Sequence, residues 1–193
     1  MFKYFLLYKP FNVLSQFTDE GDKKGLGSVF DFPKDVYPVG RLDADSEGLL
    51  ILTSDTRLNQ KLLNPTNGHW RTYQIQVEGI VTDDALSKLM KGVVIKVDGK
   101  EHYTRPAKAR RIETPELPER FPPVRYRKTV PDTWIELSLT EGKNRQVRKM
   151  TAAVGFPTLR LVRVAIGNIR MENPASGKVV ELDGPFVYNN MEL

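Results

Sequence analysis

The feature that most constrains the fold is an unbroken apolar run, LLIL, at residues 49–52, followed by Thr53. A strand with one solvent-exposed face alternates apolar and polar residues, whereas this run has no polar position. We therefore expect a buried strand at residues 49–53.

Most other segments have the patterns of short strands and short helices. Strands are expected at residues 3–9, 36–39, 70–77, 134–139, 159–169 and 179–182. Helices are expected at residues 57–63, capped by Asp55, at 82–91, capped by Thr82 and ended by Gly92, and at 143–154. Residues 113–131 contain five prolines and are expected to form a long connection. The pattern predicts an α+β fold.

Composition excludes several classes of protein. The chain has no cysteine, which excludes a disulfide framework and a thiolate metal site. It has two histidines, too few for a histidine-rich metal centre. No apolar run reaches the length of a membrane span, and the N-terminus lacks the features of a signal peptide. We expect no membrane association and a cytoplasmic location.

Positive charge is concentrated in the second half of the chain. The net charge is +5, but residues 105–170 hold fifteen Lys and Arg against six Asp and Glu, a local charge of +9. Such an imbalance favours a polyanionic partner, most simply nucleic acid.

An acidic segment, GRLDADSEG at residues 40–48, lies between two expected strands, where functional loops are commonly held. Asp43, Asp45, Glu47 and Gly48 match the first half of a calcium-binding EF-hand loop. Ser54 stands where that loop needs a bidentate carboxylate, which argues against calcium. A magnesium-dependent nuclease would need further acids from other strands. A glycosidase-like carboxylate pair and simple turn capping both remain open from the spacing alone.

The segment YPVGRLD at residues 37–43, followed by GLLILT at 48–53, resembles the catalytic motif of the pseudouridine synthases. It is most similar to the RsuA/RluE-type branch, which modifies ribosomal RNA. Four further stretches resemble motifs of that branch in the same order: LYKP at residues 7–10, RTY at 71–73, EGKNRQVRKM at 141–150 and LVRVAIG at 161–167. Several ordered motifs make the resemblance specific.

The resemblance implies a role for each of five residues. Asp43 is expected to be catalytic, either as a nucleophile at the sugar or as the base that removes a sugar proton. Arg148 is expected to hold the ionised Asp43. Tyr73 is expected to stack on the uracil and Leu161 to pack against it. Arg41 is expected to help displace the target nucleotide.

Five basic residues are candidate contacts of the RNA. Lys143, Arg145, Lys149 and Arg163 are expected at phosphates, and Lys9 at the pocket or the RNA.

The fold that the family implies is a mostly antiparallel, mixed sheet in two lobes with flanking helices. We expect one catalytic domain over residues 1–193 and no S4-like RNA-binding module, because the motifs begin near residue 3. The implied reaction isomerises a specific uridine, with 23S ribosomal RNA as the expected partner, and needs neither cofactor nor metal. We expect a monomer. The alternatives are a non-catalytic rRNA-binding or ribosome-assembly protein, an enzyme that modifies a different RNA, and a metal-dependent nuclease.

Overall fold

A computed structural model describes residues 1–64, 68–125, 127 and 129–191. Its main sheet has the strand order β10-β1-β3-β9-β4-β8-β7, with β2 paired to β3. All neighbours are antiparallel except β3 and β9. The strands are β1 (Tyr4–Lys9), β2 (Tyr37–Pro38), β3 (Glu47–Thr53), β4 (Arg71–Glu78), β7 (Lys108–Ile112), β8 (Asp132–Leu139), β9 (Thr158–Ile166) and β10 (Val179–Leu182).

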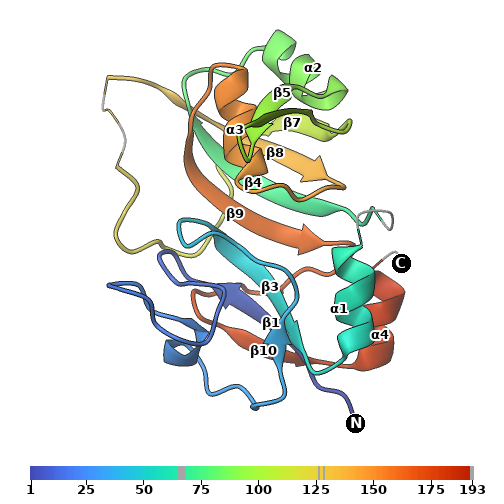
Figure 1. Ribbon diagram of the computed structural model, residues 1–193. Helices are drawn as coiled ribbons and strands as arrows, with labels where there is room; N and C mark the ends of the chain where they lie inside the picture. Colours follow the sequence, from blue (N-terminus) through green and yellow to red (C-terminus); the bar gives the residue numbers. More distant parts are fainter. Residues whose placement is uncertain (65–67, 126, 128, 192–193) are drawn as a thin grey trace.

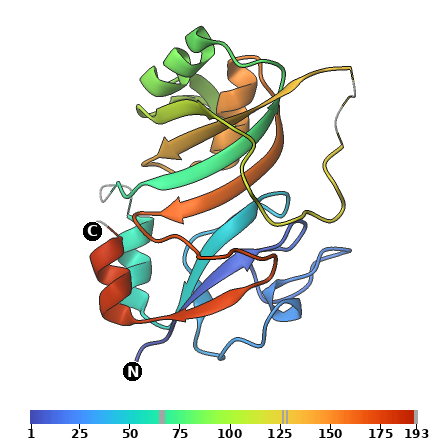
Figure 2. The ribbon, with the colours of Figure 1, turned by 180° about the vertical axis from the view of Figure 1, so that it is seen from behind.

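A separate hairpin and short helices complete the mixed α+β fold (Figures 1 and 2). The hairpin consists of β5 (Val94–Val97) and β6 (Lys100–Tyr103). The helices are α1 (Thr56–Leu63), α2 (Asp83–Lys91), α3 (Gln146–Ala153) and α4 (Gly184–Asn190), with a 3-10 turn at Leu26–Ser28. Asp55 and Thr82 cap α1 and α2 as predicted. None of the helices in the described part of the chain is long and apolar enough to span a membrane.

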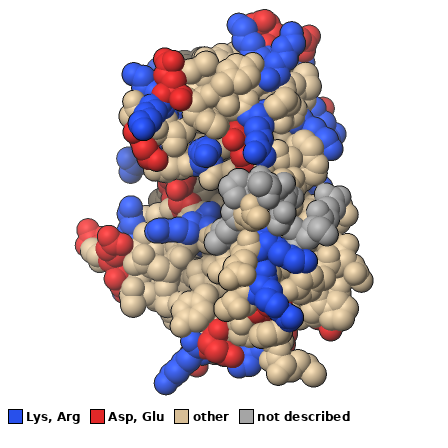
Figure 3. All heavy atoms as spheres, turned by 45° about the vertical axis from the view of Figure 1, so that its right-hand side comes forward, with Lys and Arg blue, Asp and Glu red and all other residues tan. Residues whose placement is uncertain are grey.

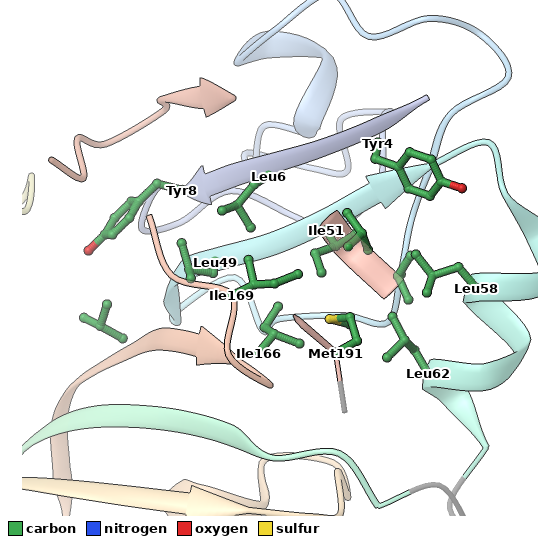
Figure 4. Packing of buried hydrophobic residues seen from close by; sticks show 13 residues of the cluster. Tyr4, Leu6, Tyr8, Leu49, Ile51, Leu58, Leu62, Ile166, Ile169 and Met191 are labelled. Carbon is green, nitrogen blue, oxygen red and sulfur yellow. The ribbon is translucent and has the colours of Figure 1, made fainter. Parts of the chain in front are cut away.

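The lower half of the sheet in Figure 1 is covered on both faces. Leu49 and Ile51 of β3 pack with residues of α1 and α4, and Figure 4 shows Leu58 and Leu62 of α1 on that side. Leu50 and Leu52 pack on the opposite side, with apolar residues of the segment between β1 and β2. The predicted buried strand is confirmed, because every residue of β3 is buried.

The upper half is formed by β4, β8 and β7, with α2, α3 and the β5–β6 hairpin packed against it (Figure 1). Strand β9 joins the halves, since Leu161 belongs to the upper core and Val162 to the lower one. Strands β3 and β9 pair over a short stretch: only Glu47 with Val162 and Gly48 with Arg163 are in register.

This junction depends on one close backbone approach and one buried ion pair. Gly48 has φ +101°, and a Cβ there would overlap the carbonyl oxygen of Arg163. Glu47 accepts hydrogen bonds from Arg160 at 2.9 and 2.8 Å, and both side chains are buried. The start of β3 and the middle of β9 therefore meet at a fixed position.

The structure differs from the sequence prediction at a few elements. Helix α3 begins at Gln146 rather than at residue 143, because Arg145 adopts a left-handed conformation with φ 53°. The hairpin β5–β6, strand β7 and helix α4 were not predicted. Strand β7, with the sequence KARRI, contains three cations and does not resemble a buried strand. Residues 113–131 contain no helix or strand where they are described, as expected.

Candidate active site

A cleft of about 1200 Å³ opens beside the junction of the two halves. Its lining comes from residues 39–46, from β4 and β9, from the end of β6 and from residues 139–147. Lys and Arg side chains gather above and below the hollow between the two halves (Figure 3). Segments that are far apart in the sequence therefore share one concave, basic surface.

The loop that carries Asp43 is held by hydrogen bonds from residues 9–15. The buried Ser15 hydroxyl donates to the carbonyl of Leu42 at 2.7 Å and accepts from its amide at 3.0 Å. The amide of Asn12 donates to the carbonyl of Ala44 at 2.7 Å. The Asp43 side chain itself remains 37% exposed and lines the cleft. The neighbours of Asp43 are thus fixed while its carboxylate is accessible.

Lys9 holds the same loop from inside the protein. Its side chain is fully buried, and Nζ donates to the carbonyls of Val13 at 2.6 Å, Pro10 at 2.9 Å and Ala44 at 3.4 Å. Burial lowers the pKa of Lys9 to about 7, although nearby carboxylates act in the opposite direction. This lysine is therefore an internal support of the loop. Its burial argues against the expected contact with RNA.

Arg145 and Arg148 form their hydrogen bonds with Asp45 rather than with Asp43. Arg145 binds the Asp45 carboxylate through two hydrogen bonds of 3.0 and 2.9 Å. Arg148 donates to the Asp45 carbonyl at 2.6 Å and places Nε 3.4 Å from Oδ2. The ion pair of Asp43 within the described residues is with Arg145, at 3.8 Å. The expected pairing of Asp43 with Arg148 is thus replaced: Arg145, in a left-handed conformation just before α3, and Arg148, in the first turn of α3, both contact Asp45.

The charge on Asp45 is stabilised by these contacts. Burial raises the pKa of its carboxyl, but the Arg145 hydrogen bonds and the charges of Arg148 and Arg145 outweigh burial and leave the pKa below its usual value. Glu47 is equally committed to Arg160. Within the described residues, no group of three or more potential ligands is placed to hold a metal ion. The carboxylates that matched half of a calcium loop are instead paired with arginines.

The sheet forms the opposite wall of the cleft. Tyr73 of β4 is paired with Arg163 of β9, and Leu161 lies two residues away on the same face. Tyr73 is half-buried and Leu161 is buried. The structure thus brings Asp43, Tyr73, Leu161 and Arg41 together around one cleft, as predicted. Their chemical roles remain predictions.

The cations predicted to bind RNA occupy different environments. Lys143 and Arg145 are exposed and line the cleft. Lys149 is half-buried and lies outside the lining. Arg163 is 5% exposed and donates Nε to the carbonyl of Leu49 at 2.7 Å, while Nη2 has no hydrogen bond among the described residues. The burial of Arg163 argues against its expected contact with a surface phosphate.

Two residues of the cleft had no signal of their own in the sequence. His69 is buried, and burial together with Arg71 and Arg163 lowers its pKa to about 4, so its ring is neutral at pH 7. Glu141 accepts hydrogen bonds from the Arg105 amide and the Gln146 side chain. Only the motif at residues 141–150 could have pointed to Glu141, and its function there could not be deduced from spacing.

Comparisons with known proteins agree with this arrangement. Residues 3–153 match the family described as RNA pseudouridylate synthase. The chain is 54% identical to "Ribosomal large subunit pseudouridine synthase E" of Xanthomonas axonopodis pv. citri over 169 residues, which cover 86% of this chain and 87% of the relative. It is 47% identical to the protein of the same name from Vibrio parahaemolyticus, covering 93% of this chain and 74% of the relative.

The fold also matches solved structures. A pseudouridylate synthase crystal structure superposes with a TM-score of 0.79 at 24% identity, covering 99% of this chain and 74% of the other. At this identity the likeness concerns the fold alone. It agrees with the mixed, mainly antiparallel sheet and the four helices described above.

Proposed function

Because the chain belongs to the RNA pseudouridylate synthase family, we propose that it converts a specific uridine of ribosomal RNA to pseudouridine, with Asp43 as its catalytic carboxylate. The observation that carries this proposal is that two aspartates of the acidic loop, Asp43 and Asp45, differ in their contacts with arginines. Asp45 takes the hydrogen bonds of Arg145 and Arg148, while Asp43 stays accessible in the cleft.

The reaction breaks the N1–C1′ bond of uridine, turns the uracil and forms a C5–C1′ bond; C5 then loses its proton, and N1 gains one. No atom is gained or lost, so the reaction itself requires neither an oxidant nor a group donor. Two roles for Asp43 fit this chemistry: nucleophile at C1′, and base for a proton of the sugar. Both need an exposed carboxylate that is not held by close hydrogen bonds to cations. Asp43 is 37% exposed, and its ion pair with Arg145 is 3.8 Å long. Asp45 is equally exposed, at 38%, but accepts two hydrogen bonds from Arg145, and Glu47 is buried against Arg160.

The sheet wall suits the uracil ring. Tyr73 offers an aromatic surface for stacking, and Leu161 an apolar contact beside it. Arg148 acts indirectly: it positions the loop that carries Asp43 by contacting the carbonyl and the carboxylate of Asp45. Arg41 lies exposed at the cleft, where it can occupy the space that a displaced nucleotide leaves.

The proposed substrate is large-subunit ribosomal RNA, because the relatives described above carry that substrate in their names. The exposed Lys143 and Arg145 supply positive charge beside the proposed catalytic carboxylate. The proposal includes a cytoplasmic, monomeric enzyme. The substrate assignment predicts that modification is confined to one or a few sites of 23S RNA, rather than spread over every exposed uridine.

The test uses purified protein with ribosomal RNA that carries tritium at C5 of uridine, in the presence of EDTA. Wild-type protein should release tritium and leave pseudouridine at a site that carbodiimide treatment and primer extension can map. Asp43→Asn should lower the rate by at least about 10²-fold, since a carboxylate in general acid–base catalysis contributes roughly 10²–10⁴.

Asp22→Asn is the matched control, because Asp22 is an exposed acid outside the cleft lining. It should turn over as the wild type does. Undiminished release by Asp43→Asn would refute the role of Asp43. RNA cleavage that disappears with EDTA, without any pseudouridine, would point to a metal-dependent nuclease instead.

A further inference from the structure

The cleft lining includes an exposed tyrosine to which the proposed function assigns no role. Tyr103 ends strand β6 and is 62% exposed, yet it belongs to the lining of the same cleft as Asp43. Val94, directly opposite it in the hairpin, is 51% exposed. The end of the hairpin that reaches the cleft therefore exposes this apolar pair, and the exposed Lys96 and Glu101 follow it on the same face.

The ring of Tyr103 is fixed in place. Gly92 ends helix α2 with φ +105°, and a Cβ at this position would come within 3.1 Å of Cε1 of Tyr103. The Tyr103 hydroxyl donates to the carbonyl of Lys91 at 3.4 Å. The ring thus rests against the end of α2 and keeps most of its surface free. An aromatic ring that is already ordered loses little conformational entropy on binding.

The hairpin is coupled to the catalytic loop through Glu141. Its carboxylate is 3.1 Å from Nε2 of His102 and accepts from the amide of Arg105 at 2.8 Å and from Gln146 at 2.7 Å. Burial raises the pKa of Glu141, but these hydrogen bonds outweigh burial and keep its pKa below the usual value. Four residues further along the chain, Arg145 binds Asp45 and lies 3.8 Å from Asp43. The position of Tyr103 is therefore set relative to Asp43.

Two cations share the cleft lining with this ring. Arg105 and Lys143 line the cleft with Tyr103, and Figure 3 shows cations along both sides of the hollow. An ordered aromatic ring beside cations is the arrangement by which proteins hold unpaired nucleotides: bases stack on the ring while cations meet the backbone phosphates.

We propose that Tyr103 is a stacking platform for an unpaired base of the RNA that neighbours the target uridine. The inference rests on the proposed function, in that a target nucleotide drawn out toward Asp43 leaves its neighbours unpaired at the mouth of the cleft. The occupant is a nucleotide rather than another protein, because the ring belongs to the lining that holds Asp43, and Arg105 and Lys143 line the same cleft. Tyr103 thus adds affinity and helps to choose a single-stranded or loop substrate, without taking part in bond making.

The test measures RNA affinity and turnover separately. The probes are a short fluorescein-labelled oligouridylate, followed by anisotropy, and tritium-labelled ribosomal RNA. Tyr103→Ala should weaken oligouridylate binding roughly 5- to 100-fold, the range expected for one stacked base. It should raise KM for ribosomal RNA by a similar factor and leave kcat nearly unchanged. Tyr103→Phe keeps the ring and should bind within about twofold of the wild type.

Phe121→Ala is the matched control, because Phe121 is a large ring, 89% exposed, outside the cleft lining. It should bind both probes as the wild type does. Thermal melting by circular dichroism verifies that each variant is folded. Tyr103→Trp adds a direct signature: its fluorescence should be quenched on binding RNA, measured against the background of Trp70 and Trp134 in the wild type.

The two proposals can fail separately. If wild-type protein forms pseudouridine while folded Tyr103→Ala binds oligouridylate as tightly as Phe121→Ala does, the stacking inference is wrong and the proposed function stands. Equal losses in Tyr103→Phe and Tyr103→Ala would also overturn stacking, since the hydroxyl would then be the essential group. If oligouridylate affinity depends on the ring but no pseudouridine forms, the proposed function fails and the nucleotide site remains.

Discussion

Replacing Lys9 by methionine removes one ammonium group from the interior while keeping a side chain of similar length. Its Nζ donates to three carbonyls, and these lie on both segments that build the catalytic loop. The carbonyl of Ala44 keeps a second donor, the amide of Asn12, at 2.7 Å. The carbonyls of Pro10 and Val13 lose their lysine donor. The perturbation is therefore the loss of two strong hydrogen bonds at a buried site.

Each buried carbonyl left without a donor costs about 1–3 kcal/mol, so the two lost bonds cost about 2–6 kcal/mol. Removing a desolvated charge offsets part of this, and the lowered pKa of Lys9 shows that the offset is substantial. We expect Lys9→Met to lower the free energy of unfolding by about 2–3 kcal/mol, which corresponds to a fall in Tm of roughly 4–12 °C for a chain of this size.

Urea denaturation followed by circular dichroism measures the effect. Lys24→Met is the matched control: Lys24 is an exposed lysine whose 2.8 Å ion pair with Asp19 lies on the surface, and such pairs contribute at most about 1 kcal/mol. Turnover should also fall in Lys9→Met, because the loop of Asp43 loses its internal support. If Lys9→Met and Lys24→Met unfold at the same urea concentration, the assigned role of Lys9 is wrong.

The pH dependence gives a second check on Lys9. Its pKa is about 7 in the folded protein and near the ordinary lysine value, 10.5, in the unfolded chain. Between these values the unfolded chain binds more protons, so the stability of the wild type should rise as pH increases from 7 toward 10. Lys9→Met should lack this contribution. A wild-type slope no steeper than that of the variant would contradict the assignment.

Three further substitutions test the loop and the junction. Asp45→Ala frees the two arginines and should reduce turnover at least about tenfold in the tritium assay, with the fold intact; unchanged turnover would show that the arginine contacts are dispensable. Glu47→Gln leaves Arg160 buried without its anion and should cost about 3–5 kcal/mol in urea denaturation; wild-type stability would mean the pair is not buried in solution. Gly48→Ala should destabilise by more than about 3 kcal/mol, while Gly99→Ala, also at positive φ but in open space, should cost clearly less; equal losses would exclude the close approach.

Local rules explain why much of the fold was readable from the chain. The apolar run at residues 49–52 requires burial whatever its neighbours are, and caps such as Asp55 and Thr82 act within one turn of helix. Strand β7 and the β5–β6 hairpin were missed for the opposite reason. Strands β6 and β7 are rich in charged residues, and β5 is apolar but only four residues long, so pairing with other strands is what makes these segments strands.

The candidate site divides in the same way. The sequence alone pointed to the loop of Asp43 and to Tyr73 and Leu161 as candidate site residues. Each of them lies in a motif that is a short contiguous pattern. Only the tertiary structure decided that Arg145 and Arg148 bind Asp45, and that Lys9 and Arg163 lie inside the protein. The physical reason is that a charge has no fixed partner along the chain. Arg145 and Asp45 are a hundred residues apart, and whether a cation meets a carboxylate, a carbonyl or solvent depends on which segments the fold places beside it.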